Sequence, residues 1–199
     1  MDTYFTLAEP APMALFKDKN SKFLGFAFPI QTDTEIKGIL DSLRKAHPGA
    51  VHVCWAAQWG TQTVFQRAND DGEPAHTAGT PLLGQLVSFN LTQTLLAVVR
   101  YYGGVKLGVS GLINAYKTAG KEVLNGAQII EKQLETTFEI LSDYPNMSKA
   151  LRFIKEKNLR LIEQQLEEEC RWVVAVRKSR TEEMEAALQA AYGLRFTTQ

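Results

Sequence analysis

The stretch TLLAVVRYYGGVKLGVSGLINAY, residues 94–116, decides how the larger part of the chain is interpreted. Its first nine residues form a nearly continuous apolar run, which is typical of a central strand of a sheet. A glycine-rich loop follows, and a helix is then predicted over about residues 111–124, with Ser110 as its N-cap and Gly126 at its end. The sequence therefore predicts a strand, a loop and a helix in direct succession.

This glycine-rich loop has the parts of an anion cradle. A helix start exposes unpaired backbone N–H groups and a partial positive charge, and glycines let a ligand approach the backbone. The spacing matches neither a Walker A loop nor a dinucleotide-binding loop. A tight turn that needs glycine only for its geometry is the other interpretation, and both stay open. The candidates for phosphate or nucleic-acid binding are Arg100, Tyr101, Gly103, Gly104, Lys106, Gly108, Ser110 and Gly111.

A second loop, DDGEPAHTAGTP at residues 70–81, is acidic. Each of its carboxylates would repel a phosphate by roughly 1 kcal/mol at 4 Å in water. Three roles are open: ion pairs with Arg67, Arg100 or Lys106, a magnesium site, or caps on backbone N–H groups. Pairing and capping are favoured over the metal. The candidate residues of this loop are Asp70, Asp71, Gly72, Glu73, Thr77 and Gly79, and Thr80 followed by Pro81 is expected to begin a helix.

Histidines and a cysteine near the acidic loop allow two further kinds of site. His52 and Cys54 share one face of a predicted strand and could bind zinc together with His76. Cys54, His76 and Asp71 could form a nucleophilic triad. A buried thiol among ordinary histidines is the favoured interpretation. We therefore assign no catalytic residue, no metal site and no cofactor.

Composition bounds the class of protein. The 199 residues are 45% hydrophobic and 22% charged, which is typical of a globular chain with one large or two small domains. The formal net charge is zero, so nucleic-acid binding would require a local basic patch. No apolar run approaches the roughly 18 residues of a membrane span, and no secretory signal is visible. The two cysteines lie far apart, which indicates a reducing, cytoplasmic location without a membrane partner.

The remaining elements divide the chain in two. A strand is predicted over residues 21–30, a helix after Thr32 and Glu35, and a hairpin that turns near Gly60. Beyond residue 134 the order is strand, helix, strand, acidic turn at residues 167–169, strand, helix capped by Ser179, and strand. This β-α-β-β-α-β order is typical of a ferredoxin-like domain. Two α/β domains are therefore predicted, meeting near residues 127–134.

Several separated motifs resemble the IMPACT family, in particular its bacterial YigZ-like members. They are SKFLGFAFPI from residue 21, HPGAVHVCWA from residue 47, NDDGEPAHTAGTPLL from residue 69 and VVRYYGGVKLGVSGLINAY from residue 98. The resemblance implies an α+β protein. Residues 1–130 would form an IMPACT N-terminal-like domain with the ribosomal protein S5 domain 2-like fold. Residues 131–199 would form a ferredoxin-like domain resembling the last domain of elongation factor G.

The leading hypothesis from the resemblance and the loops is a non-enzymatic protein of translational control that binds RNA or the ribosome. Arg100 and Lys106 would contact phosphate, and Tyr101 or Trp59 would stack on a base. One alternative is an enzyme that acts on a phosphorylated or nucleotide-like small molecule, with the two loops as its pocket. Another is a module that binds a protein partner in translational control. A cavity of several hundred Å³ at the loops would favour the enzyme, an open basic groove the RNA binder, and a flat apolar patch the protein-binding module.

Overall fold

The computed structural model is a mixed α/β protein and describes residues 2–167 and 169–198. The chain forms two compact units, one comprising Tyr4–Lys132 and the other Met1–Thr3 with Gln133–Gln199. Each unit has its own hydrophobic core, so each is described separately. Glu168, in the expected acidic turn, lies outside the described residues.

A five-stranded antiparallel sheet forms the larger unit, in the order β2-β3-β6-β4-β5. The predicted apolar strand is β6, and it is central: β3 pairs with one side of it and β4 with the other. A central strand is buried on both faces, which explains its unbroken run of apolar residues. The bounds of the strands are Ala14–Asp18 for β2, Ser21–Pro29 for β3, His52–Trp59 for β4, Phe65–Asn69 for β5 and Thr94–Tyr101 for β6.

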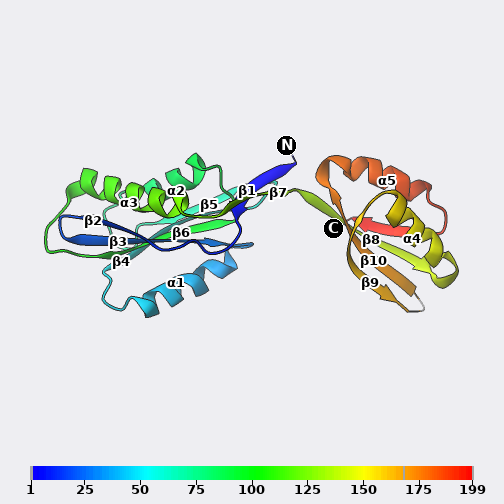
Figure 1. Ribbon diagram of the computed structural model, residues 1–199, viewed down its shortest axis with the longest axis horizontal. Coiled ribbons are helices and arrows are strands. Elements are labelled where there is room, and N and C mark those ends of the chain that lie inside the picture. Colours follow the sequence, from blue (N-terminus) through cyan, green and yellow to red (C-terminus); the bar gives the residue numbers. More distant parts are fainter. Residues whose placement is uncertain (1, 168, 199) are drawn as a thin grey trace. The chain divides into compact units, whose positions relative to one another are not determined.

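Helices cover both faces of this sheet. Helices α2 and α3 lie over one face and α1 lies over the other (Figure 1). The core beneath α2 and α3 contains Phe23, Cys54 and Tyr116, and the core beneath α1 contains Val53 and Val99. The bounds are Thr34–Ala46 for α1, Gly79–Ser88 for α2 and Gly108–Asn125 for α3.

Alternation along β6 determines which side chains reach the loops. Successive side chains of a strand point to opposite faces. Val98 packs in the core under α3, whereas Val99 and Tyr101 pack with the α1 core. Arg100 therefore points toward α2 and α3, and Tyr101 points away from them.

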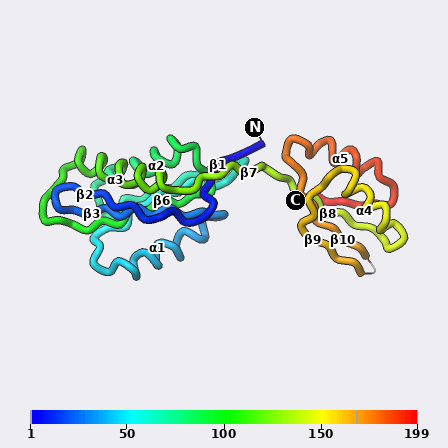
Figure 2. Tube along the Cα trace, in the orientation of Figure 1, coloured from blue at the N-terminus to red at the C-terminus, as the bar shows by residue number. Residues whose placement is uncertain are grey.

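The smaller unit has the β-α-β-β-α-β element order that the sequence predicts. Its antiparallel sheet has the order β11-β8-β10-β9, and one core joins the sheet to both helices. The Cα trace in Figure 2 shows α4 and α5 beside this sheet. Trp172, Phe138 and Met184 are fully buried in that core. The bounds are Glu135–Asp143 for β8, Met147–Glu156 for α4, Arg160–Leu166 for β9, Glu169–Arg177 for β10, Thr181–Ala190 for α5 and Arg195–Thr198 for β11.

Three helix starts differ from the sequence expectation. Helix α3 begins three residues before Gly111, so Ser110 lies inside its first turn and caps nothing. Helix α2 begins at Gly79, and Thr80 and Pro81 also lie inside a first turn. Ser179 lies in a 3₁₀ turn ahead of α5 and is not its cap. Hydroxyl residues thus did not mark the first residue of these three helices, because other parts of the fold determine where each helix begins.

Two short strands near the ends of the larger unit have no clear sequence signal. Strand β1, Thr3–Leu7, pairs with β7, Ile129–Gln133, in a separate two-stranded sheet. Their pairing joins residues more than a hundred positions apart, so only the tertiary fold makes them strands. No helix in the described ranges has both the length and the apolar character needed to cross a membrane.

Candidate functional site

The two loops meet around a cavity of about 570 Å³ on the α3 side of the sheet. We call it the loop cavity. It combines charged groups from β4, β6 and both loops with an apolar wall formed largely by the start of α3. The lining residues are Val51, His52, Glu73, Pro74, Arg100, Tyr102, Lys106, Leu107, Gly108, Val109 and Leu112. A volume of several hundred Å³ is typical of sites for compact ligands.

Strand register brings the polar groups of the loop cavity together. Arg100 of β6 pairs in register with His52 of β4 on one side and with Phe23 of β3 on the other. Directly paired residues of neighbouring strands present their side chains on the same face of a sheet. His52 and Arg100 are therefore neighbours although they are 48 positions apart in the sequence.

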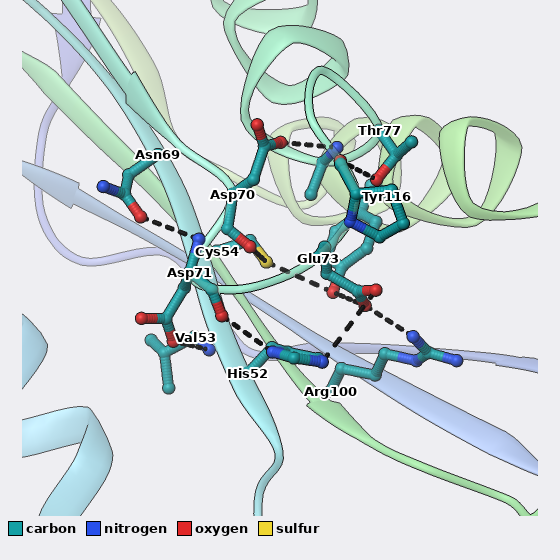
Figure 3. Close-up of polar contacts among 12 residues, drawn as sticks. His52, Val53, Cys54, Asn69, Asp70, Asp71, Glu73, Thr77, Arg100 and Tyr116 are labelled. Carbon is teal, nitrogen blue, oxygen red and sulfur yellow. Dashed lines mark hydrogen bonds and ion pairs between the residues drawn. The ribbon is translucent and has the colours of Figure 1, made fainter. Parts of the chain in front are cut away.

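Arg100 and Glu73 form a buried ion pair at the wall of the loop cavity (Figure 3). The Arg100 guanidinium donates to Glu73 Oε1 at 2.5 Å, and the two side chains are only 7% and 4% exposed. Arg100 Nε is also buried and has no hydrogen-bond partner within the described residues. A buried donor without an acceptor costs about 1–3 kcal/mol, and because Nε is closed to solvent, a molecule in the loop cavity would not contact it.

Glu73 also anchors α3 to the acidic loop. Tyr116 of α3 donates its hydroxyl hydrogen to Glu73 Oε1 at 2.8 Å. Cys54 Sγ lies 3.3 Å from the Tyr116 hydroxyl oxygen and 3.0 Å from the Asp70 carbonyl oxygen. Burial raises the pKa of the Cys54 thiol and the pKa of the Tyr116 hydroxyl above their ordinary values. Both groups are therefore neutral hydrogen-bonding groups at neutral pH, and Cys54 is a poor nucleophile.

His52 is held in one orientation at the edge of this network. Its Nδ1 donates to the Asp71 carbonyl oxygen at 2.7 Å, because a carbonyl can only accept. Its Nε2 lies 3.9 Å from Glu73 Oε2. This separation is too long for a direct hydrogen bond, so Nε2 is available to a group bound in the loop cavity.

Asp70 caps the N-terminus of α2. Its carboxylate accepts hydrogen bonds of 2.8–2.9 Å from the backbone N–H groups of His76, Ala78 and Gly79. Partial burial alone would raise the pKa of Asp70, but these three donors outweigh it and hold the pKa below its ordinary value. The backbone N–H groups at the start of α2 thus donate to the protein's own carboxylate, and Thr80 is not needed as a cap.

Asp71 joins the acidic loop to two other elements. Its carboxylate accepts from the Val53 backbone N–H of β4 and from Arg44 of α1, both at 2.7 Å. Arg44 is absent from the partners that the sequence suggests, because α1 lies far away along the chain. Pairing and capping, the two favoured roles, each occur in this loop, and Asp70 and Asp71 do not line the loop cavity.

The glycine-rich loop brings the chain to the start of α3. Gly103 passes so close to the preceding hairpin that a Cβ there would lie 2.1 Å from the Asn20 carbonyl carbon. Gly108, the first residue of α3, has a φ of +76°, in the left-handed region that favours glycine. No side chain in the described part of the chain caps α3. Its first residues, Gly108, Val109 and Ser110, are exposed, and the first N–H groups of a helix have no acceptor within the helix.

The structure places only some of the predicted site residues at the loop cavity. Arg100, Lys106, Gly108 and Glu73 line it. The others surround it or lie elsewhere: Gly103, Gly104, Ser110 and Gly111 in or after the glycine loop, and Asp70, Asp71, Gly72, Thr77 and Gly79 in the acidic loop.

The two residues expected to stack on a base need correction. Tyr101 packs on the α1 face and shares a hydrogen bond of 2.9 Å with His47 Nδ1. Trp59 is half-buried and stacks on Phe65. Tyr102, 47% exposed and beneath the Arg100 guanidinium, lines the cavity in place of Tyr101. Strand alternation relative to Arg100 is the signal that could have identified Tyr102.

The metal and nucleophile alternatives do not assemble. In the part of the chain that the structure describes, no three His, Cys, Asp or Glu residues gather as metal ligands. His76, which both the zinc site and the triad require, is exposed and contacts Thr80. It lines a second hollow of about 670 Å³ beside α2 and α3, whose other lining residues include Ile113, Lys117 and Lys121.

The sequence identifies the class of protein. The pattern of the family described as Impact N-terminal domain matches residues 19–124. The chain is 34% identical over 163 residues to the IMPACT family member YvyE of Bacillus subtilis, covering 82% of this chain and 75% of that one. It is 32% identical to the IMPACT family member YigZ of Escherichia coli, over 71% of each chain. The chain belongs to the IMPACT family.

One solved structure is similar to almost the whole chain. The crystal structure of a hypothetical protein superposes with a TM-score of 0.72 at 26% sequence identity, covering 98% of this chain and 97% of that chain. The elements of both units therefore have counterparts in another protein of similar length.

Proposed function

We propose that the protein binds a phosphate-bearing ligand in the loop cavity and acts in translational control by binding RNA there. The observation that carries this proposal is the convergence of three positive groups on one cavity: Arg100, Lys106 and the uncapped start of α3. A phosphate accepts hydrogen bonds from all three kinds of donor. The link to translation rests on what the resemblance to the IMPACT family implies.

The placement of the acidic residues removes the main objection to phosphate binding. Of the three carboxylates, only Glu73 lines the loop cavity, and its charge is matched by Arg100. Asp70 and Asp71 are turned to backbone N–H groups and Arg44. Lys106 forms no ion pair in the described ranges, so its charge is available to a ligand.

Binding of RNA to wild type and to Lys106→Ala at two salt concentrations tests this proposal. We expect binding at low salt that weakens as salt rises, because phosphate contacts release counterions. Lys106→Ala should lower the affinity by about three- to tenfold, equivalent to about 0.7–1.4 kcal/mol. Lys37→Ala on α1, an exposed lysine on the opposite side of the sheet, is the matched control and should bind normally. Absence of binding at low salt, or equal loss in both variants, would contradict the proposal.

An enzyme acting on a phosphorylated small molecule is the second candidate function. The size of the loop cavity favours it, as does the position of His52 Nε2, which lies 3.9 Å from Glu73 Oε2 with Nδ1 fixed by a carbonyl. A histidine in this arrangement can act as a general base. Turnover of a phosphorylated substrate that His52→Gln abolishes, with binding retained, would favour this candidate over simple binding.

The same proposal extends to the domains. We propose that residues 1–130 form an S5 domain 2-like domain and residues 131–199 a ferredoxin-like domain. The strand order β11-β8-β10-β9, with α4 and α5 sharing one core against the sheet, supports the second assignment.

A further inference from the structure

We infer that the loop cavity recognises a terminal phosphate monoester carried on an apolar or aromatic body, such as the phosphorylated end of an RNA, and not an internal phosphodiester. This inference rests on the proposed phosphate binding and specifies its ligand. Three features carry it: the charge of the cavity, the buried guanidinium of Arg100 and the apolar wall.

The charge of the loop cavity suits a dianion. Arg100, Lys106 and the positive end of α3 face a single carboxylate, Glu73. That carboxylate already accepts from both Arg100 and Tyr116 at Oε1. The surplus positive charge is therefore well above one unit when the helix end is included. A phosphate monoester carries about −1.5 to −2 at neutral pH, whereas an internal diester carries a single charge.

The buried donor points to a specific ligand and not to loose surface attraction. The Arg100 side chain is 93% buried, since only 7% of it is exposed, and within the described residues its guanidinium donates only to Glu73. The same side chain lines the cavity that the start of α3 borders. Helix α3 has 18 residues, so its N-terminus carries a full helix dipole. A ligand oxygen in the cavity could accept from the guanidinium N–H groups that Glu73 leaves free.

The rest of the cavity wall is apolar, and this favours the end of an RNA strand over its continuous sugar-phosphate backbone. Val51, Pro74, Leu107, Val109 and Leu112 line the cavity together with the ring of Tyr102. An internal phosphodiester would bring charged phosphates on both sides against these side chains. A terminal phosphate brings only one nucleoside, whose ring can pack on Tyr102 and the aliphatic groups.

Fluorescence polarisation with one short labelled RNA in three forms tests the inference. The forms carry a 5′-phosphate, a 3′-phosphate or no terminal phosphate. We expect one phosphorylated form to bind about tenfold or more tightly than the unphosphorylated form. Equal binding of all three would overturn the inference and leave RNA binding intact. Absence of binding by every form would overturn the proposed function itself.

Two variants on one helix provide the matched comparison. Val109→Glu places a carboxylate in the first turn of α3, at an exposed wall position where acidic residues favour a helix, so the fold should persist. It should remove the preference for the phosphorylated form. Ile113→Glu lies one turn further along and lines the second hollow, so it should keep the preference. Equal effects of the two variants would contradict recognition at the loop cavity.

Competition by adenosine 5′-monophosphate identifies the source of the phosphate. Weak competition, with the phosphorylated RNA binding much more tightly, supports an RNA end. If the mononucleotide binds as tightly as the RNA, the terminal phosphate is confirmed and the ligand is a small molecule. The inference is wrong if adenosine 5′-monophosphate competes no better than adenosine and phosphorylated RNA competes no better than unphosphorylated RNA.

Discussion

At the residue scale, the carboxylates of the acidic loop make different contacts and therefore have different structural roles. Asp70 binds backbone amides, Asp71 binds a cation and an amide of other elements, and Glu73 is buried against Arg100. The three lie within four consecutive positions, so neither their chemistry nor their place in the sequence separates their roles. Their separation comes from the turn between them, in which Asp71 and Gly72 have positive φ and redirect each side chain.

Asp70→Asn tests the capping role at this scale. The folded-state pKa of Asp70 is depressed, so its contribution to stability is present above the unfolded pKa and is lost as pH falls through the folded pKa. We expect Asp70→Asn to lower the free energy of unfolding by about 1 kcal/mol at pH 7. The difference from wild type should shrink well below pH 4. Urea titrations at pH 7 and pH 3 measure both quantities.

Asp41→Asn is the control for that prediction. Asp41 is exposed on α1, and its substitution should leave the unfolding free energy nearly unchanged at both pH values. A difference between wild type and Asp70→Asn that does not vary with pH would show that the charge of Asp70 does not cap α2.

At the element scale, α3 is positioned by the loop that precedes it. The predicted helix start at Gly111 was wrong because α3 needs no side-chain cap: Gly108 enters the helix from a left-handed conformation. Gly103 meets the β2–β3 hairpin in the same loop. Gly103 and Gly108 are therefore required by the geometry of the loop, and this requirement is compatible with either interpretation of the loop.

Gly103→Ala tests this positioning. The added methyl group would overlap the backbone at Asn20, so the loop must move and the variant should lose about 2 kcal/mol or more of stability. Gly38→Ala on α1 is the matched substitution, because a Cβ there meets nothing within 4 Å and alanine favours a helix. It should gain about 0.5–1 kcal/mol. Thermal or urea unfolding compares the two, and equal stability of both variants would contradict the argument.

At the scale of the whole molecule, the three core clusters divide between the two units. Two lie within the larger unit and the third within the smaller, and among the residues that the structure describes no cluster contains members of both units. A hydrophobic core is the cooperative unit of a small domain. Stability should therefore belong to each unit separately.

Scanning calorimetry of two core variants tests this independence. Leu96→Ala in the larger unit and Ile140→Ala in the smaller each remove a fully buried side chain. Each should cost about 2–5 kcal/mol. We expect wild type to unfold in two transitions and each variant to lower the temperature of only one. A single transition that both variants shift together would contradict separate folding.

The sequence by itself determined the class of each major element. The apolar run at Thr94, the hairpin around Gly60 and the order of elements after residue 134 are local periodicities, and each became the expected structure. Local sequence motifs likewise carry the resemblance to the IMPACT family, and the family is confirmed.

Only the tertiary structure decided which residues share the loop cavity. His52 and Arg100 meet through strand register, Tyr102 replaces Tyr101 through strand alternation, and Arg44 reaches Asp71 from the opposite face of the sheet. These contacts join positions tens of residues apart, and nothing in local sequence encodes that separation. The physical reason is that burial and strand pairing act on the folded chain as a whole, whereas propensities act on neighbours along it.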